Sequence, residues 1–303
     1  MGANCRPVHC PPKTGAPGCA SGVNAMSDRL KVLPQYLMPK LAMTRFAKFV
    51  ASNAWGHVTT SIIRRFVAHY GVNMAEAAQP DITAYKTFND FFTRALKPGA
   101  RPLADAPLIC PVDGAISQVG RIQGDQIYQA KGQAFSTTAL VGGDAELAAR
   151  FQDGLFANLY LSPKDYHRIH MPASGRLVSM VHVPGELFSV NPTTARGVPG
   201  LFARNERLVC VFDDDALGRW VLVLVGATIV GSMATVWHGL VNRAGPVRAW
   251  NYPAGQVTLA QGEEMGRFLL GSTVVMLFEK SGLQFNPAWQ PGGSIRMGEW
   301  MAR

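Results

Sequence analysis

The feature that most constrains the fold is the pattern of residues 105–303, where short apolar runs alternate with Gly, Pro and Asp. The runs include QVGRIQG, ANLYLSP, RLVSMVHVPG, RLVCVFDDD and RWVLVLVGATIVGSM. Runs of this length, separated by hairpin-like breaks such as DDDALGR, indicate short β-strands. None reaches the roughly 20 apolar residues that a membrane-spanning helix needs. Apart from one helix near Ala145–Gln152, we therefore expect a β-rich domain over residues 99–303.

The N-terminal third has a helical pattern instead. Residues 39–70 carry apolar side chains at helical spacing, and TFNDFFTRALKPGARPL at 87–103 reads as a short helix ended by Lys-Pro-Gly. The apolar positions are Met43, Phe46, Ala47, Val50 and Ala54, then Ile63, Phe66, Val67 and Tyr70. Residues 1–25 are expected to be disordered, with Met26 as an alternative start. The predicted class is α+β, with an amphipathic helical region at 26–98 packed on a β-rich catalytic domain of mixed or antiparallel sheets.

Positive charge is concentrated at the N-terminus. Residues 1–75 hold nine Lys or Arg against one acid, Asp28, so this segment carries +8 of the formal net charge of +9. Two interpretations remain open, a helical hairpin packed on its own core or a helix lying in the interface of an anionic membrane. The absence of any acid from 29 to 75 favours the membrane. A nucleic-acid partner is not expected, because no basic and aromatic groove pattern follows.

The cysteines and histidines predict no metal site. The five cysteines show no paired spacing, and no third ligand accompanies His167 and His170 at a zinc-site interval. A disulfide framework is not expected at this chain length, which favours a reducing compartment.

Two motifs hold side chains that could act as acid or base. YLSPKDYHRIHMPASG at 160–175 places His167 and His170 three residues apart, and a turn at Ser-Pro-Lys-Asp would bring the two imidazoles side by side. PVDG contains Asp113. An Asp before Gly is common turn chemistry, but Asp113 would orient the ring of His170 if the two faced each other.

A third motif could supply a hydroxyl. In GRFLLGSTVVMLFEK, residues 266–280, Gly271, Ser272 and Thr273 interrupt a buried strand. A bulge or bend is the simple explanation. The other is a nucleophile that attacks its own chain, since Gly271 leaves the carbonyl before Ser272 unhindered.

Together these motifs resemble a known family. PVDG, YLSPKDYHRIHMP, VPGELFSVN, LFARNERLVCVFD, VGATIVGSMATVW and GEEMGRFLLGSTV occur in the order and wording of the pyruvoyl-dependent phosphatidylserine decarboxylases of the bacterial and mitochondrial type. LPQYLMPKLAMTR and TFNDFFTRALKPGARP resemble the family's N-terminal region. The resemblance covers the chain from Leu30 almost to its C-terminus and leaves 1–25 outside.

The resemblance implies self-cleavage between Gly271 and Ser272. The products would be a β chain, 1–271, and an α chain, 272–303, which stay together as a heterodimer; the family suggests a dimer of these units. Ser272 would become a pyruvoyl group, with no metal and no pyridoxal phosphate. Asp113, His170 and Ser272 match the family's self-processing triad, and His167 matches its proton donor for decarboxylation.

The resemblance also implies a substrate and a location. Phe188 and Ser189, with Val190, match positions near the substrate. The substrate would be phosphatidylserine in an anionic membrane, converted to phosphatidylethanolamine and CO₂. The expected location is the cytoplasmic side of a bacterial cell membrane, as a peripheral protein, in preference to the mitochondrial inner membrane.

Three other functions remain open from the residues. One is a pyruvoyl decarboxylase of another amino-acid substrate. A second is an uncleaved serine hydrolase that uses Asp113, His170 and Ser272 but lacks a Gly-x-Ser-x-Gly elbow. The third is a lipid-binding module without activity.

Overall fold

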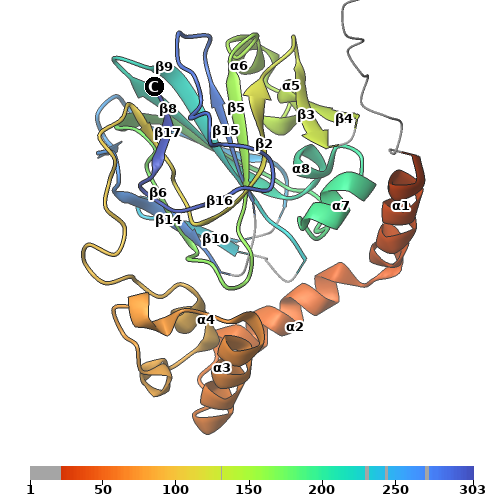
Figure 1. The fold of residues 1–303 in the computed structure, drawn as a ribbon, viewed down its shortest axis with the longest axis vertical. Coiled ribbons are helices and arrows are strands. Elements are labelled where there is room, and N and C mark those ends of the chain that lie inside the picture. Colours follow the sequence, from red (N-terminus) through yellow and green to blue (C-terminus); the bar gives the residue numbers. More distant parts are fainter. Residues whose placement is uncertain (1–21, 131, 229–231, 243–244, 270–272) are drawn as a thin grey trace, which may run out of the picture.

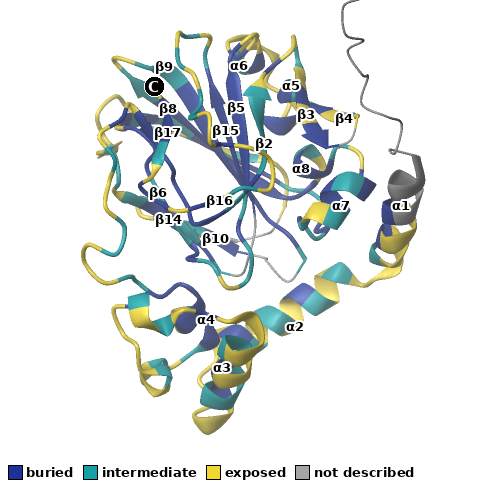
Figure 2. Cartoon of the chain, viewed as in Figure 1, coloured by how far each residue is buried: buried dark blue, intermediate teal, exposed yellow. Residues whose placement is uncertain are grey.

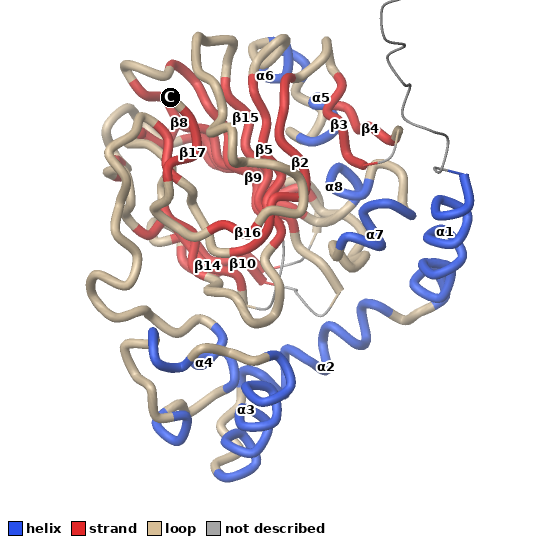
Figure 3. Tube along the Cα trace, in the orientation of Figure 1, coloured by secondary structure: helices blue, strands red, loops and turns tan. Residues whose placement is uncertain are grey.

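The computed structural model of the chain describes residues 22–130, 132–228, 232–242, 245–269 and 273–303. A β domain carries a helical N-terminal segment along one side (Figures 1 and 3). We call this segment, residues 22–98, the helical arm. The helices are Gly22–Leu37 (α1), Lys40–Ser52 (α2), His57–Tyr70 (α3), Phe88–Phe92 (α4), Thr137–Leu140 (α5), Ala145–Ala149 (α6), Pro192–Gly197 (α7) and Leu201–Arg204 (α8), with 3-10 turns at Met74–Glu76 (η1) and Ile82–Ala84 (η2). The predicted α+β class is confirmed.

The strands form two main sheets and two short ribbons. They are Leu108–Ile109 (β1), Gly114–Arg121 (β2), Gln126–Ala130 (β3), Gln133–Ser136 (β4), Leu155–Tyr160 (β5), Arg168–His170 (β6), Gly175–Val183 (β7), Arg207–Asp214 (β8), Gly218–Val225 (β9), Ser232–Thr235 (β10), Gly239–Asn242 (β11), Arg248–Asn251 (β12), Thr258–Leu259 (β13), Glu264–Phe268 (β14), Thr273–Phe278 (β15), Ser294–Ile295 (β16) and Trp300–Ala302 (β17). The larger sheet has the order β12-β7-β8-β9-β15-β5-β2-β16, with β13 also on β7, and the smaller has β11-β10-β14-β6. Neighbouring strands in both sheets are antiparallel.

The centre of the larger sheet is buried on both faces. All six residues of β15 and the last six of β9 are buried, because one core packs on each side. The face that contains Leu222 and Met276 meets the smaller sheet, and the face that contains Val223 and Val275 meets the short helices α5 to α8. Double burial explains why these strands read as continuous apolar runs instead of alternating ones.

The helical arm is attached at two places. Near its start, Val32 of α1 belongs to the core beneath α7, and the Asp28 carboxylate accepts a 2.6 Å bond from the Arg196 guanidinium. Further on, α2, α3 and α4 share a small separate core, and the ring of Phe92 in that core packs 4.0 Å from the ring of His167 in the β domain. Between these contacts α2 runs along the molecule with much of its surface exposed (Figure 2).

Several elements differ from the sequence prediction. Helix α1 begins at Gly22, inside the stretch expected to be disordered, and residues 1–21 lie outside the described part. Helix α4 ends at Phe92, well before Lys-Pro-Gly, because a Thr87/Asp90 capping box fixes only a short helix and the chain then turns away. The helix predicted near Ala145–Gln152 is confirmed as α6, whereas α5, α7 and α8 were not predicted.

Candidate active site

The predicted cleavage point lies between two strands of different sheets. Gly271 and Ser272 themselves are outside the described residues. On the N-terminal side, β14 belongs to the smaller sheet, and the amide of Leu269 donates to the carbonyl of Ser232 at 3.2 Å. On the C-terminal side, Thr273 begins β15 of the larger sheet, with Tyr160 and Val225 as its strand neighbours.

His167 is buried next to the end of β14, the strand that precedes the cleavage point. Its carbonyl accepts the amide of Phe268 at 3.1 Å, and its ring packs 4.0 Å from the ring of Phe92. Nδ1 lies 2.8 Å from the carbonyl of Asp165, so Nδ1 carries the proton. Nε2 is buried without a hydrogen-bond partner. Burial, assisted by the nearby Arg94 cation, lowers the pKa of His167 to about 3, so the imidazole is neutral at pH 7.

His170 lies on β6 with both ring nitrogens occupied. Nδ1 is 2.8 Å from the carbonyl of Gly262, which fixes the proton on Nδ1. Nε2 is 3.0 Å from the hydroxyl of Tyr166 and accepts its proton. Burial raises the pKa of Tyr166 to about 12, which keeps that hydroxyl a donor, and burial lowers the pKa of His170.

Asp113 lies directly before β2, where the chain approaches β5 closely. A side chain at Gly114 would collide with the carbonyl of Tyr160, since its Cβ would lie 2.2 Å away. Three donors hold the Asp113 carboxylate. The Arg101 guanidinium donates from Nε at 2.9 Å and from Nη2 at 2.6 Å, and the amide of Met297 donates at 2.9 Å.

Two predicted contacts are not present. No hydrogen bond joins Asp113 to His170, both of which are described, because Arg101 holds the carboxylate and Gly262 orients the ring. The two imidazoles are not side by side either. The turn at Pro163–Asp165 ends before His167, so the chain is extended from His167 to His170 and the rings meet different partners. Ser272, the third member of the expected triad, lies outside the described residues.

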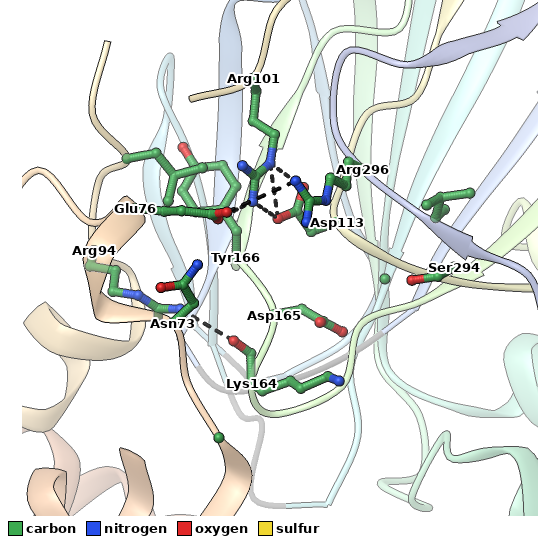
Figure 4. A pocket seen from close by; sticks show the side chains of 14 residues that line it. Asn73, Glu76, Arg94, Arg101, Asp113, Lys164, Asp165, Tyr166, Ser294 and Arg296 are labelled. Carbon is green, nitrogen blue, oxygen red and sulfur yellow. Dashed lines mark hydrogen bonds and ion pairs between the residues drawn. The ribbon is translucent and has the colours of Figure 1, made fainter. Parts of the chain in front are cut away.

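Asp113 and Tyr166 line one cavity of about 230 Å³ between the helical arm and the sheets. Figure 4 shows the Arg101 guanidinium between the carboxylates of Asp113 and Glu76, with Lys164 and Asp165 on the other side of the cavity. Burial raises the pKa of Asp165. The cavity therefore brings Asp113 and the Tyr166 partner of His170 to one wall, although they come from distant segments.

The predicted substrate residues lie elsewhere, against α1 and α2. Phe188 is buried, with the Tyr36 ring 4.9 Å away and the Lys40 ammonium 3.4 Å above its own ring. The amide of Ser189 donates to Gln35 Oε1 at 3.0 Å. Val190 lines a second cavity, of about 520 Å³, which also reaches Tyr160, the strand neighbour of Thr273.

Three residues of the site were not predicted from the sequence, namely Arg101, Tyr166 and Gly262. Arg101 lies in the loop KPGARPL and Tyr166 directly precedes His167, so both belong to motifs that resemble the family. Gly262 contributes only its carbonyl, which no residue type signals. In the described part of the chain, no cluster of three His, Cys, Asp or Glu side chains could hold a metal ion.

Comparison with known proteins identifies the class. A family model described as phosphatidylserine decarboxylase matches residues 88–303, and a second, described as PSD, matches residues 30–71. A phosphatidylserine decarboxylase proenzyme of Polaromonas naphthalenivorans (strain CJ2) is 71% identical over 282 residues, covering 91% of this chain and 97% of the relative. The proenzyme of Methylibium petroleiphilum (strain ATCC BAA-1232 / LMG 22953 / PM1) is 70% identical over 279 residues, with 91% and 98% covered.

The chain is thus a decarboxylase, an enzyme of the lyase class, built on an antiparallel β domain with a helical arm. It belongs to the phosphatidylserine decarboxylase family, and the resemblance noted in its motifs is confirmed.

Proposed function

We propose that this protein cleaves itself between Gly271 and Ser272 and then decarboxylates phosphatidylserine to phosphatidylethanolamine and CO₂. The observation that carries the proposal is the position of the connection 269–273. Its two ends are anchored in different sheets, and the buried His167 lies against the first of them. Because Leu269 and Thr273 are each held by a sheet, both residues should keep their positions after the chain between them is cut.

The self-cleavage needs a base for the Ser272 hydroxyl. The hydroxyl oxygen attacks the Gly271 carbonyl carbon, and the peptide C–N bond breaks to give an ester with a free amine. Elimination then releases the Gly271 carboxylate and leaves dehydroalanine, which water converts to a pyruvoyl group and ammonia. His170 is the proposed base, because the lone pair of Nε2, which accepts the Tyr166 hydroxyl, becomes available once that hydroxyl moves away.

Two residues that flank the connection 269–273 fit a pyruvoyl group formed from Ser272. Thr273 follows Ser272 in the chain, and the carbonyl of His167 accepts the amide of Phe268 at the end of β14. Each has one buried polar atom, Oγ1 of Thr273 and Nε2 of His167, without a hydrogen-bond partner in the described structure. Such atoms are costly unless a ligand or reacting group pairs with them. The group supplies a carbonyl that accepts the electrons released as CO₂ leaves, the role that pyridoxal phosphate has elsewhere.

His167 is proposed to move the proton during decarboxylation. Since the Asp165 carbonyl holds the proton on Nδ1, exchange is confined to Nε2. The substrate amine enters as an ammonium and must lose a proton before it can react as a nucleophile, so Nε2 can accept that proton. A pKa of about 3 makes the resulting imidazolium strongly acidic, and it gives the same proton up readily to the carbanion.

The helical arm is proposed to dock the enzyme on the cytoplasmic face of an anionic membrane. Leu37, Leu41, Phe46 and Phe49 expose half or more of their surface along α1 and α2. Arg45 and Lys48 also lie on α2. None of the described helices is long and apolar enough to span a bilayer. Apolar burial combined with basic side chains is how an interfacial helix binds anionic lipid.

The cleavage is tested by intact mass of the purified protein. We expect a 32-residue fragment, 272–303, that carries a pyruvoyl group in place of its N-terminal serine. Ser272→Ala should remain one chain of about 32.7 kDa. An uncleaved wild-type protein with full decarboxylase activity would refute the proposal, and CO₂ release from free serine but not from phosphatidylserine vesicles would favour the soluble-substrate alternative.

A further inference from the structure

A row of three charged side chains connects the helical arm to Asp113. Arg101 Nη2 lies 2.6 Å from Asp113 Oδ2 and 2.7 Å from Glu76 Oε2, and Arg101 Nη1 donates to the carbonyl of Ala100 at 2.8 Å. The side chains of Arg101 and Asp113 are 7% and 10% exposed. The guanidinium therefore donates to Asp113 from two of its nitrogens, Nε and Nη2 (Figure 4). Both side chains are largely shielded from water, and hydrogen bonds between charged groups are strong there.

Glu76 is itself fixed by the backbone of the arm. It ends η1, directly after α3, and its carbonyl accepts the amide of Lys97 at 2.9 Å. The next residues continue this pairing, since the amide of Ala78 donates to the carbonyl of Ala95. Arg101 lies only a few residues beyond this pairing. The position of Arg101 thus depends on the same backbone that holds Glu76.

We propose that Arg101 is a positioning residue for Asp113 in self-cleavage, and that Glu76 holds Arg101 in place, so that cleavage depends on a correctly folded helical arm. The inference rests on the proposed function, because Asp113 matters here only if it takes part in processing.

Glu76 has a second basic partner, since Arg296 Nη1 lies 3.9 Å from Glu76 Oε1. Glu76, Arg101, Asp113 and Arg296 together are therefore neutral, and the role of Glu76 is to hold the Arg101 guanidinium in place. The Asp113 carboxylate acts in favour of a protonated His170, against the burial that lowers its pKa. A lysine could supply the charge of Arg101 but not the two parallel hydrogen bonds that its guanidinium donates to Asp113.

The test measures self-cleavage of newly synthesised chains by gel electrophoresis over time. Arg101→Ala should slow cleavage by about 10- to 100-fold, the usual cost of misplacing a reacting group by about 1 Å. Arg101→Lys should be intermediate, and Glu76→Gln should slow cleavage less than Arg101→Ala. Adding guanidinium ion to the purified, uncleaved R101A chain, below denaturing concentrations, should restore cleavage, whereas the same concentration of urea should not.

Arg219 offers a matched control. It forms an equivalent two-donor pair with Asp213, at 2.7 and 2.8 Å, on the β8–β9 hairpin. Arg219→Ala should cleave at the wild-type rate. Wild-type-like cleavage of R101A, or a slow R101A chain that guanidinium does not rescue, would overturn the inference while leaving self-cleavage intact. Wild-type-like cleavage of E76Q would overturn the link to the arm, and a wild-type chain that never cleaves would refute the proposed function itself.

Discussion

His167 and His170 differ in surroundings more than their spacing suggests. His167 has no exposed surface, and among the described residues its ring is hydrogen-bonded to one backbone carbonyl, that of Asp165. His170 is hydrogen-bonded to Tyr166, which lines the same cavity as Asp113. Burial lowers the pKa of both rings, and the shift of His167, to about 3, is large. The unfolded chain therefore binds a proton at His167 far more readily than the folded chain does.

The lowered pKa of His167 predicts that this one residue makes the folded protein less stable in acid. The contribution of neutral His167 to the free energy of unfolding is fully present above the ordinary histidine pKa of 6.5. It is lost as pH falls from about 6.5 toward about 3, because the unfolded chain then binds a proton that the folded chain does not. His167→Asn, made in the uncleavable Ser272→Ala chain, should lose less unfolding free energy between pH 7 and pH 5 than Ser272→Ala alone. The expected difference is about 2 kcal/mol. Urea unfolding at both pH values measures it.

The comparison needs no absolute stability, because each chain serves as its own reference. Equal losses in the two chains would show that His167 is protonated in the folded protein, contrary to its burial.

The sequence was sufficient to find the chemically able side chains but not their partners. Asp113, His167 and His170 stood out by residue type and motif. The partner of Asp113 is an arginine in a loop, and the partner of His170 is a carbonyl 92 residues further along the chain. Such contacts are set by how distant segments fold back, which local spacing does not encode.

Among the elements, α1 and α2 have the most exposed apolar surface. The central strands β9 and β15 were predictable, because a strand that is buried on both faces consists of consecutive apolar residues. Helix α2 was predictable from apolar residues that recur with a period of about 3.6. The period did not reveal which face would be covered. Thr44 and Ala51 of α2 are buried, whereas Phe46 of the predicted stripe and Phe49 outside it are exposed.

The exposed side chains predict a specific effect on membrane binding. Replacing Leu37, Phe46 and Phe49 together with Ser should weaken binding to vesicles that contain anionic lipid by at least about tenfold, since three large apolar groups would no longer enter the interface. Sedimentation with phosphatidylglycerol vesicles measures the affinity. Self-cleavage should be unchanged, because none of the three belongs to a core cluster.

Leu103 provides the control for this experiment. It is 49% exposed on the connection between α4 and β1, away from α1 and α2. Leu103→Ser should bind vesicles like the wild type. Unchanged binding by the triple variant would show that another surface contacts the lipid.

At the scale of the whole molecule, the proposed cut divides the central strands between two chains. Residues 273–303 supply β15, which lies between β9 and β5, as well as β16 and β17 at the margins. Each residue of β15 faces a partner on both neighbouring strands, and its side chains enter both cores. The smaller product is therefore part of the core and not an appendage.

This position predicts that the two chains separate only when the protein unfolds. All six residues of β15 are buried, so extracting the strand would expose its apolar surface on both faces and leave the facing ladder groups of β5 and β9 unpaired. The processed enzyme should elute from a sizing column as one species that contains both chains, and dilution should not separate them. In urea, loss of the 32-residue chain should coincide with loss of β-sheet circular dichroism in a single transition. Release of that chain before the sheet signal falls would mean that β15 is held by fewer contacts than its place in the sheet implies.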